Sequence, residues 1–386
     1  MLTPTYNSDS PYSTYADSAN AARLLADCTA QAVTWRWATE SMGEPTPFMQ
    51  EHYGGPKPRW LADDKADPER HMHHGFDAEG RLVLQRQSRG RATAWLHEAD
   101  GRTGVDLQVY EGEPSVSTVT RYRHAGGLLV AQHISHGHKG LDTRYEWQDG
   151  QLQRAVTSNW ANGQKTWLCQ DVYRYDEAGR LDTITLEYLD DDGTPSGETR
   201  LSYRRPRKGE TLASVAARVE ALLVEAITHA LAQVPRDEKI YALFICYTQE
   251  DFGAAWPPFL VWGREPYRRA IVEAGEEVRY YLWAPDEIRA VQGDAHERWF
   301  DDTVLKEACL LHAQFMDIAQ STASAMRVLK NLAAHFNAPA SQALLNTTDD
   351  FVVAHADNTG EIDPLKAMKV ALAPERWALL KARGLV

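Results

Sequence analysis

The sequence is poor in cysteine and places no two cysteines close together. Its 386 residues contain four, at Cys28, Cys169, Cys246 and Cys309, and none forms a CxxC pair. This spacing argues against a disulfide framework and against a cysteine zinc site. No apolar run is long enough to cross a bilayer, and the N-terminus has neither the basic nor the apolar segment of a secretory signal. These absences predict a cytoplasmic protein with no membrane partner.

The chain also lacks an excess of positive charge. Its formal net charge is −13, and the acidity is spread evenly over both halves without a basic patch. Proteins that bind nucleic acids need such a patch to hold phosphates, so the sequence predicts no nucleic-acid partner. An acidic chain attracts basic proteins and speeds their association, although mild acidity also serves solubility alone.

Motifs of known catalytic and cofactor sites are missing as well. The sequence contains no GxSxG elbow, no GxGxxG or GxxxxGK[ST] phosphate loop, and no HExxH metal motif. We therefore expect no cofactor and no catalytic residue, and we expect that the protein is not an enzyme.

Strand patterning is what the sequence does contain, most clearly between Asp171 and Arg205. Apolar residues recur with a period of about two, as in a sheet with one buried face. The residues concerned are Val172, Tyr173, Tyr175, Leu181, Ile184, Leu186 and Tyr188. Turn-forming residues lie at 176–179 and 190–193, so this stretch predicts consecutive β-hairpins.

The same spacing of an aromatic residue, a glycine and a leucine recurs upstream. It is found at Tyr175, Gly179 and Leu181, at Phe76, Gly80 and Leu82, and at Tyr122, Gly126 and Leu128, with looser copies at 98–101 and 145–152. A single hairpin cannot bury its own apolar face, so repeated hairpins predict pairing side by side.

Two of these copies, Phe76-Asp-Ala-Glu-Gly-Arg-Leu82 and Tyr175-Asp-Glu-Ala-Gly-Arg-Leu181, resemble the tyrosine-aspartate (YD) repeats of bacterial RHS proteins. The resemblance covers roughly residues 70–205, and the copies at Tyr122 and Tyr145 lack the aspartate. Large RHS proteins form a cocoon from many repeats, whereas about five are too few to enclose a toxin. The alternative is a short antiparallel sheet that uses the same kind of turn.

The rest of the chain predicts mainly helices with a few buried strands. Expected helices run from Asp17 or Ser18 to about Ala38, from Thr211 to about Val234, over 266–273, and from Asp301 or Asp302 to about Phe336, with two short helices at the end. Expected strands are Ile240–Tyr247, Phe259–Trp262, Val278–Trp283 and Asp350–His355.

Together these elements predict an α+β protein in three parts. Residues 1–60 form an N-terminal helix and an irregular lead-in, and residues 61–207 form an antiparallel β-hairpin repeat sheet. Residues 208–386 form an α/β domain with a mixed sheet and long helices.

Residues 210–386 resemble small bacterial domains that are encoded beside polymorphic toxins and are treated as candidate immunity proteins. The resemblance is carried by Ile240-Tyr-Ala-Leu-Phe244, Tyr281-Leu-Trp-Ala-Pro-Asp-Glu-Ile288 and Thr348-Asp-Asp-Phe-Val-Val353. It implies a protein that binds a cognate toxin and neutralises it by stoichiometric occlusion.

Acidic clusters and aromatics beside rigid loops are the candidate contacts for that partner. They are Asp190, Asp191, Asp192, Trp256, Glu276, Glu277, Trp283, Asp349 and Asp350. Exposed aromatics serve as interface anchors, whereas buried ones belong to the core. The aspartates have an alternative role as turn residues, and Asp301 and Asp302 as helix caps.

Two other functions remain open at this point. The first is an adaptor or chaperone that handles a toxin during RHS-associated secretion. The second is a metal-dependent hydrolase that uses one of two histidine clusters, His71, His73 and His74 or His133, His136 and His138. Imidazoles at such spacing can bind zinc or nickel, but no acidic residue or cysteine completes either set nearby.

Overall fold

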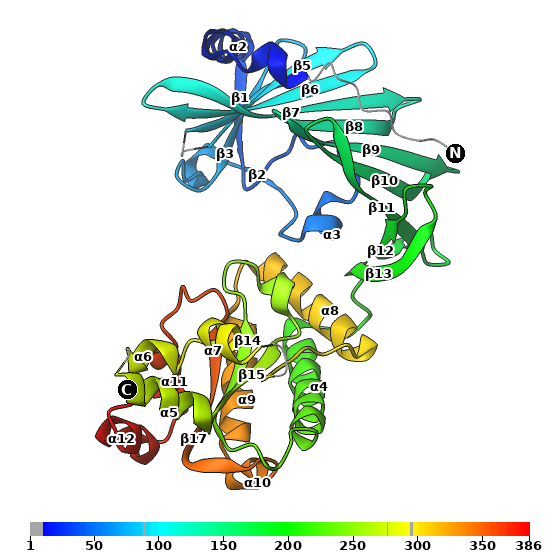
Figure 1. Ribbon diagram of the computed structural model, residues 1–386. Coiled ribbons are helices and arrows are strands. Elements are labelled where there is room, and N and C mark those ends of the chain that lie inside the picture. Colours follow the sequence, from blue (N-terminus) through cyan, green and yellow to red (C-terminus); the bar gives the residue numbers. More distant parts are fainter. Residues whose placement is uncertain (1–10, 88–89, 276, 294–295) are drawn as a thin grey trace. The chain divides into compact units, whose positions relative to one another are not determined.

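The computed structural model describes residues 11–87, 90–275, 277–293 and 296–386. The chain divides into two compact units, Met1–Tyr203 and Arg204–Val386. As predicted, the protein is α+β: an antiparallel sheet occupies the first unit, and a separate mixed sheet with helices occupies the second (Figure 1). No helix in the described ranges is long and apolar enough to cross a membrane.

The first unit is mainly a sheet with a few short helices (Figure 1). Its elements are α1 (Pro11–Tyr15), α2 (Ser18–Gln31), β1 (Thr34–Ala38), α3 (Met49–Tyr53), β2 (Trp60–Leu61), the 3-10 turn η1 (Asp63–Lys65), β3 (Met72–Phe76), β4 (Leu82–Gln87), β5 (Arg91–Glu98), β6 (Gly101–Tyr110), β7 (Glu113–Ala125), β8 (Leu128–His136), β9 (Lys139–Gln148), β10 (Gln151–Ala161), β11 (Gln164–Tyr175), β12 (Leu181–Leu189) and β13 (Pro195–Arg204).

In the described residues, thirteen strands form one sheet in which β3 to β13 follow each other in chain order, and β1 and β2 complete the other end. Tight turns make this order possible. The β9–β10 turn has positive φ at Asp149 (52°) and Gly150 (77°), and the β10–β11 turn has positive φ at Asn162 (52°) and Gly163 (75°). Two consecutive positive φ angles are typical of the two-residue turns whose twist matches that of antiparallel strands.

The two faces of this sheet are covered by different segments. Helix α2 packs Ala21 and Cys28 against one face, on a cluster that includes Leu107 and Val119. The segment 39–58, which contains α3, lies on the opposite face (Figure 1). Its Phe48 ring lies 5.7 Å from the Tyr173 ring. We call this second face, which includes Trp95, Tyr122, Tyr145 and Tyr173, the tyrosine face.

The two turns that resemble YD repeats share one geometry. In the β11–β12 turn, Asp176 Oδ1 accepts from the backbone N–H of Ala178 at 3.0 Å and of Arg180 at 2.9 Å. Asp176 Oδ2 accepts from Arg180 Nε at 3.0 Å. Asp77 does the same in the β3–β4 turn, with Arg81 N at 2.8 Å and Arg81 Nε at 2.8 Å. The aspartate therefore fixes these turns through its own carboxylate. Kinship with RHS proteins stays a prediction.

Replacing Asp176 by alanine is expected to destabilise the β11–β12 hairpin by about 1–2 kcal/mol, because four hydrogen bonds to its carboxylate that close the turn are lost. The measurement is hydrogen exchange of β11 and β12 by mass spectrometry along a urea series. Glu177→Ala, an exposed change in the same turn, is the control and should alter the free energy of opening little. Equal effects of the two variants would contradict the role given to Asp176.

The first helix was predicted too long. Helix α2 ends at Gln31, and Thr34–Ala38 form strand β1, which pairs with β3 in the register Trp35 to Gly75. Trp35, Arg36 and Trp37 alternate between the faces of the sheet, as successive residues of a strand do. Residues 34–38 and 60–61 are thus strands of the large sheet.

The second unit combines a small sheet with helices on both sides. Its elements are α4 (Leu212–Ala232), β14 (Ile240–Tyr247), the 3-10 turn η2 (Phe252–Ala255), β15 (Phe259–Arg264), α5 (Glu265–Ala274), α6 (Val278–Tyr281), α7 (Pro285–Gln292), β16 (Glu297–Arg298), α8 (Thr303–Ala319), α9 (Ala323–Phe336), α10 (Pro339–Gln342), β17 (Thr347–Asp357), α11 (Pro364–Ala371) and α12 (Pro374–Ala382).

The sheet has the order β16-β15-β14-β17, with β14 parallel to β17 and antiparallel to β15. Every residue of β14 is buried, as its apolar sequence predicts for a central strand. One core contains Leu243 and Ile245 with α4, α8 and α9. The other contains Phe244 and Cys246 with Trp283 and the C-terminal helices. The two cores lie on opposite faces because alternate residues of a strand do.

Two predictions for this unit were wrong. Val278–Tyr281 form the short helix α6 instead of a strand, and Thr303–Phe336 form two helices instead of one. Helix α8 ends at Ala319, and the next residue, Gln320, is left-handed with a φ of 48° and turns the chain into α9. The predicted caps were right: Thr211 accepts from Ser214 N at 3.2 Å, and Asp302 accepts from Leu305 N at 2.7 Å.

Candidate functional site

The acidic turn 190–192 lies at the end of the large sheet, between β12 and the edge strand β13. Asp192 Oδ1 accepts from Thr194 N at 2.9 Å, and Gly193 N donates to Asp190 O at 2.9 Å. The Asp191 side chain is 96% exposed and pairs with Lys165 at 2.8 Å. The turn role and the surface role of these aspartates are therefore compatible, because the turn holds the carboxylates outward.

Two exposed aromatic side chains lie beside this turn. Leu168 pairs with Leu189, and Cys169 pairs with Tyr188, so Trp167 and Tyr188 project from the same face on adjacent strands. Trp167 is 41% exposed and Tyr188 is 42% exposed. We call β12, β13 and their turn, together with these two aromatics, the acidic edge hairpin.

Neither tryptophan predicted as an anchor is on the surface. Trp283 is 0% exposed, and its indole N–H donates to Leu385 O at 2.7 Å. Trp256 is 6% exposed and packs against Phe252 and His312. They belong to the two separate cores of the second unit. The prediction of exposed anchors at Trp256 and Trp283 was therefore wrong, since large aromatics serve the core by default.

The remaining predicted carboxylates differ in exposure. Glu277 is exposed at the start of α6, and Glu276 lies outside the described residues. Asp349 is largely exposed and pairs with Arg383 at 2.6 Å. The Asp350 side chain is fully buried between Arg268, at 2.9 Å, and Arg383, at 2.7 Å. Asp350 is thus part of a buried ion cluster and is not available to a partner.

The two arginines also control the ionisation of these aspartates. Burial by itself would raise the pKa of Asp350, but hydrogen bonds from Arg268 and Arg383 outweigh it and hold that pKa below its ordinary value. The hydrogen bond from Arg383 lowers the pKa of Asp349 to about 2. Both carboxylates therefore remain charged at neutral pH, which the stability of the cluster requires.

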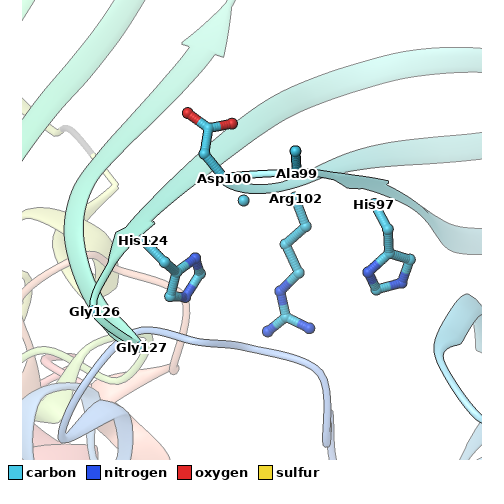
Figure 2. Close-up of a pocket in the computed structure, with 8 residues that line it drawn as sticks. His97, Ala99, Asp100, Arg102, His124, Gly126 and Gly127 are labelled. Carbon is cyan, nitrogen blue, oxygen red and sulfur yellow. The ribbon is translucent and has the colours of Figure 1, made fainter.

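An open pocket of about 480 Å³ lies at the other end of the sheet strands, where the β5–β6 and β7–β8 turns meet. His97, Arg102 and His124 line it together with residues of the two turns, including Gly126 and Gly127. Figure 2 shows these three side chains on the same side of the ribbon, whereas Asp100 points away from them. Asp100 also lines the pocket, but its carboxylate is directed to the other side of the ribbon from Arg102 and the two histidines.

No family model matches the sequence, and no curated protein matches it either. The site is therefore interpreted from its own geometry and charge.

The histidine clusters are dispersed by the strands that carry them. His73 stacks on Trp37 with ring centroids 4.1 Å apart, whereas His74 is 0% exposed and hydrogen-bonds to Gln85 at 2.9 Å. His136 Nδ1 lies 2.9 Å from the Thr118 hydroxyl, and His133 pairs with Asp142. In the ranges that the structure describes, no group of three or more histidine, cysteine, aspartate or glutamate residues is arranged to hold a metal.

The four cysteines are free thiols, and all four are buried. Burial raises the pKa of Cys28 to about 11 and that of Cys169 to about 12. Burial also raises the pKa of Cys246 and of Cys309. A thiol with a raised pKa is a poor nucleophile at neutral pH, because the thiolate is the reactive form.

The sequence alone did not single out Trp167, Tyr188 or Arg102. The available signal was the alternation of side chains along a strand: Trp167 shares a face with Cys169, and Tyr188 pairs with Cys169 across the strands. This alternation assigns residues to a face of the sheet, but it does not say how much of that face the segment 39–58 covers. Exposure of Trp167 and Tyr188 depends on that extent, which only the tertiary structure provides.

Proposed function

We propose that this chain binds a basic protein toxin through the acidic edge hairpin and neutralises it by stoichiometric occlusion. The observation that carries the proposal is the combination, at one end of the sheet, of exposed carboxylates, exposed aromatics and an edge strand with one open side. The immunity-type resemblance of residues 210–386 is consistent with the same function, and the proposal needs no catalytic residue.

The edge strand supplies a backbone docking site. Strand β13 has one neighbour, β12, in the described sheet, and its residues 195–200 are exposed. An edge strand presents N–H and C=O groups that another strand can pair with, and peptide recognition by strand addition uses this geometry. A toxin segment that pairs with β13 would be held by main-chain hydrogen bonds.

Charge restricts which partner the edge accepts. Residues 181–203 contain six carboxylates, Asp182, Glu187, Asp190, Asp191, Asp192 and Glu198, and one basic residue, Arg200. Such a local excess of negative charge attracts a basic surface and repels acidic ones. Copies of this acidic chain therefore do not readily pair edge to edge, which favours a different, basic protein.

The two aromatics supply the apolar contact. Trp167 and Tyr188 are diagonal neighbours on adjacent strands, within reach of one partner side chain. Tryptophan and tyrosine are enriched among the residues that dominate binding energy at interfaces. Flanking carboxylates would form a polar rim around them, as in other protein interfaces.

The first test is co-expression with the product of the neighbouring gene, with growth and co-purification as readouts. Rescue of growth together with a stable one-to-one complex supports the proposal. A complex without rescue would overturn neutralisation and support the adaptor function instead. If the two proteins form no complex and growth is not rescued, the whole proposal is overturned.

The triple variant Asp190→Asn, Asp191→Asn, Asp192→Asn is expected to slow association with the toxin roughly tenfold at low salt, because the steering charge is lost. Asparagine keeps an acceptor at position 192, so the turn should still form. Stopped-flow or surface-plasmon-resonance association rates, measured as a function of salt, check this.

A matched control removes the same kind of charge elsewhere. Glu111→Gln with Glu113→Gln neutralises two exposed carboxylates at the β6–β7 turn. This control should leave the association rate near that of the unmodified chain. An equal loss of rate in both variants would mean that net charge, and not the acidic edge hairpin, steers the toxin.

A further inference from the structure

We propose that the pocket between the β5–β6 and β7–β8 turns binds an oxyanion, the carboxylate or phosphate group of a small molecule, on the guanidinium of Arg102. This site lies on a different part of the sheet from the acidic edge hairpin, and it carries the opposite charge. The inference does not depend on the proposed toxin binding.

Arg102 is held in place by the rings beneath it. Its guanidinium carbon lies 4.6 Å from the centroid of the Trp95 ring and 5.9 Å from that of the Tyr122 ring. The Trp95 ring covers Gly104, the residue opposite it on β6. A Cβ at this position would come within 3.1 Å of the ring, so the glycine leaves room for it. The guanidinium is therefore pre-organised, which lowers the entropy lost when a ligand binds.

Most hydrogen-bond donors of this guanidinium are unused. Arg102 donates to the Gly43 carbonyl, and no second acceptor for it is found in the described residues. A guanidinium has five N–H donors in a fork that matches two oxygens of a carboxylate or phosphate. Because part of the side chain is buried, these donors gain more from an anion than they would in open solvent.

Arg102 also lacks an ion-pair partner. In the described part of the chain, no carboxylate oxygen lies within 4.0 Å of its nitrogens. Burial lowers the pKa of its guanidinium, although Tyr122 and Glu44 act in the opposite direction. An arginine stays protonated in proteins, so the chain carries a partly desolvated, unpaired cation here. An anion would offset that cost.

The nearby carboxylates are engaged elsewhere. Asp100 points away from the pocket (Figure 2) and pairs with Arg123 at 3.6 Å. Glu44 accepts hydrogen bonds from the Tyr122 and Thr46 hydroxyls. Neither therefore occupies the position of a ligand on Arg102.

His124 is a second candidate donor, whereas His97 already donates its Nε2–H to the Leu82 carbonyl at 2.8 Å. The imidazole of His124 has no hydrogen-bond partner among the described residues. At Gly126 and Gly127 nothing lies within 4 Å of the position of a Cβ, so the turn backbone is open to a ligand.

The test is titration of the purified full-length chain with inorganic phosphate and with acetate, at ionic strength held constant with sodium chloride. Isothermal calorimetry and the rise in melting temperature report binding. Arg102→Gln is expected to weaken binding at least tenfold, because a charge-assisted bidentate contact is lost. Arg102→Lys should be intermediate, because an ammonium keeps the charge without the fork. Tighter binding of phosphate than acetate would identify a phosphate group as the ligand chemistry.

Two variants keep the test decisive. Arg121→Gln removes an equal charge from an exposed position of the same hairpin without releasing Asp100, and it should leave binding unchanged. His124→Ala, which removes no internal hydrogen bond, should weaken binding several-fold even if Arg102→Gln folds poorly. The proposal is overturned if neither anion has an effect beyond that of chloride, or if the Arg102 and Arg121 variants bind alike.

Discussion

Replacing Asp350 by alanine is expected to lower the free energy of unfolding of the second unit by about 3–5 kcal/mol. The Asp350 side chain is fully buried and is the shared partner of Arg268 and Arg383. Arg268 is itself largely buried and lies 5.3 Å from the Tyr241 ring. Without Asp350, this buried cation loses one of its two counter-charges and keeps the Glu265 carboxylate at 2.5 Å, and it cannot reach solvent without disturbing the packing around β14 and β17.

The neighbouring residue provides the control for this prediction. The Asp349 side chain is 71% exposed and pairs with the same Arg383. Asp349→Ala should lower the free energy of unfolding by no more than about 1 kcal/mol, as exposed pairs do. Asp350→Asn keeps the shape and one acceptor, and it separates the loss of charge from the loss of packing.

Hydrogen exchange by mass spectrometry along a urea series reports the unfolding of each unit separately. We expect the shift only in peptides of Arg204–Val386. If the free energies of unfolding of Asp350→Ala and Asp349→Ala differ by less than about 1 kcal/mol, the buried ion cluster does not stabilise the second unit as proposed.

Acidification between pH 6.5 and about 4 is expected to destabilise each unit by about 3 kcal/mol through one buried histidine. Burial lowers the pKa of His74 in the first unit and of His312 in the second from 6.5 to about 4. The unfolded chain therefore takes up these protons first as the pH falls. The stability contributed by the neutral imidazoles is complete above pH 6.5 and is lost as the pH falls to about 4.

The hydrogen bonds of His74 explain why its neutral form is needed. Its Nε2 accepts from Met42 N at 3.1 Å and from Gln85 Nε2 at 2.9 Å. A proton on Nε2 would face two donors and would break both bonds. His312 is 0% exposed, and its Nε2 lies 2.9 Å from the Ser324 hydroxyl.

Unit-resolved unfolding at pH 7 and at pH 5 measures most of this loss, about 2 kcal/mol. His74→Gln should flatten the pH dependence of the first unit and leave that of the second unchanged, and His312→Gln should do the reverse. The pKa values of the paired carboxylates Asp349 and Asp350 are lowered, so these two groups do not titrate in this range. A pH profile that is unaltered by both variants would rule out these histidines as its origin.

Local signals predicted much of the fold correctly. Hairpin turns depend on a few consecutive residues, such as Asp176 to Gly179, and the buried strand Ile240–Tyr247 is marked by its own apolar run. The caps Thr211 and Asp302 act within one helical turn. Each of these features is decided by residues close together in the chain.

The errors arose where a distant partner decides the local structure. Residues 34–38 became a strand because β3 offers an edge to pair with. Val278–Tyr281 have strand-like residues but form the helical turn α6, which distant side chains hold. In that turn the carbonyl of Tyr281 accepts from the Tyr267 hydroxyl at 2.8 Å, and the carbonyl of Leu282 accepts from the Tyr241 hydroxyl at 2.9 Å.

The sequence by itself determined the elements, the turns and the acidic character of the chain, because propensity, periodicity and charge are properties of local segments. Only the tertiary structure decided which members of a local pair are exposed. Asp349 and Asp350 are adjacent, yet one faces solvent and the other holds two arginines. Trp283 fills a core, whereas Trp167 remains on the surface. Burial depends on segments far away in the chain, and burial decides whether a carboxylate or an indole stabilises the fold or is free to meet a partner.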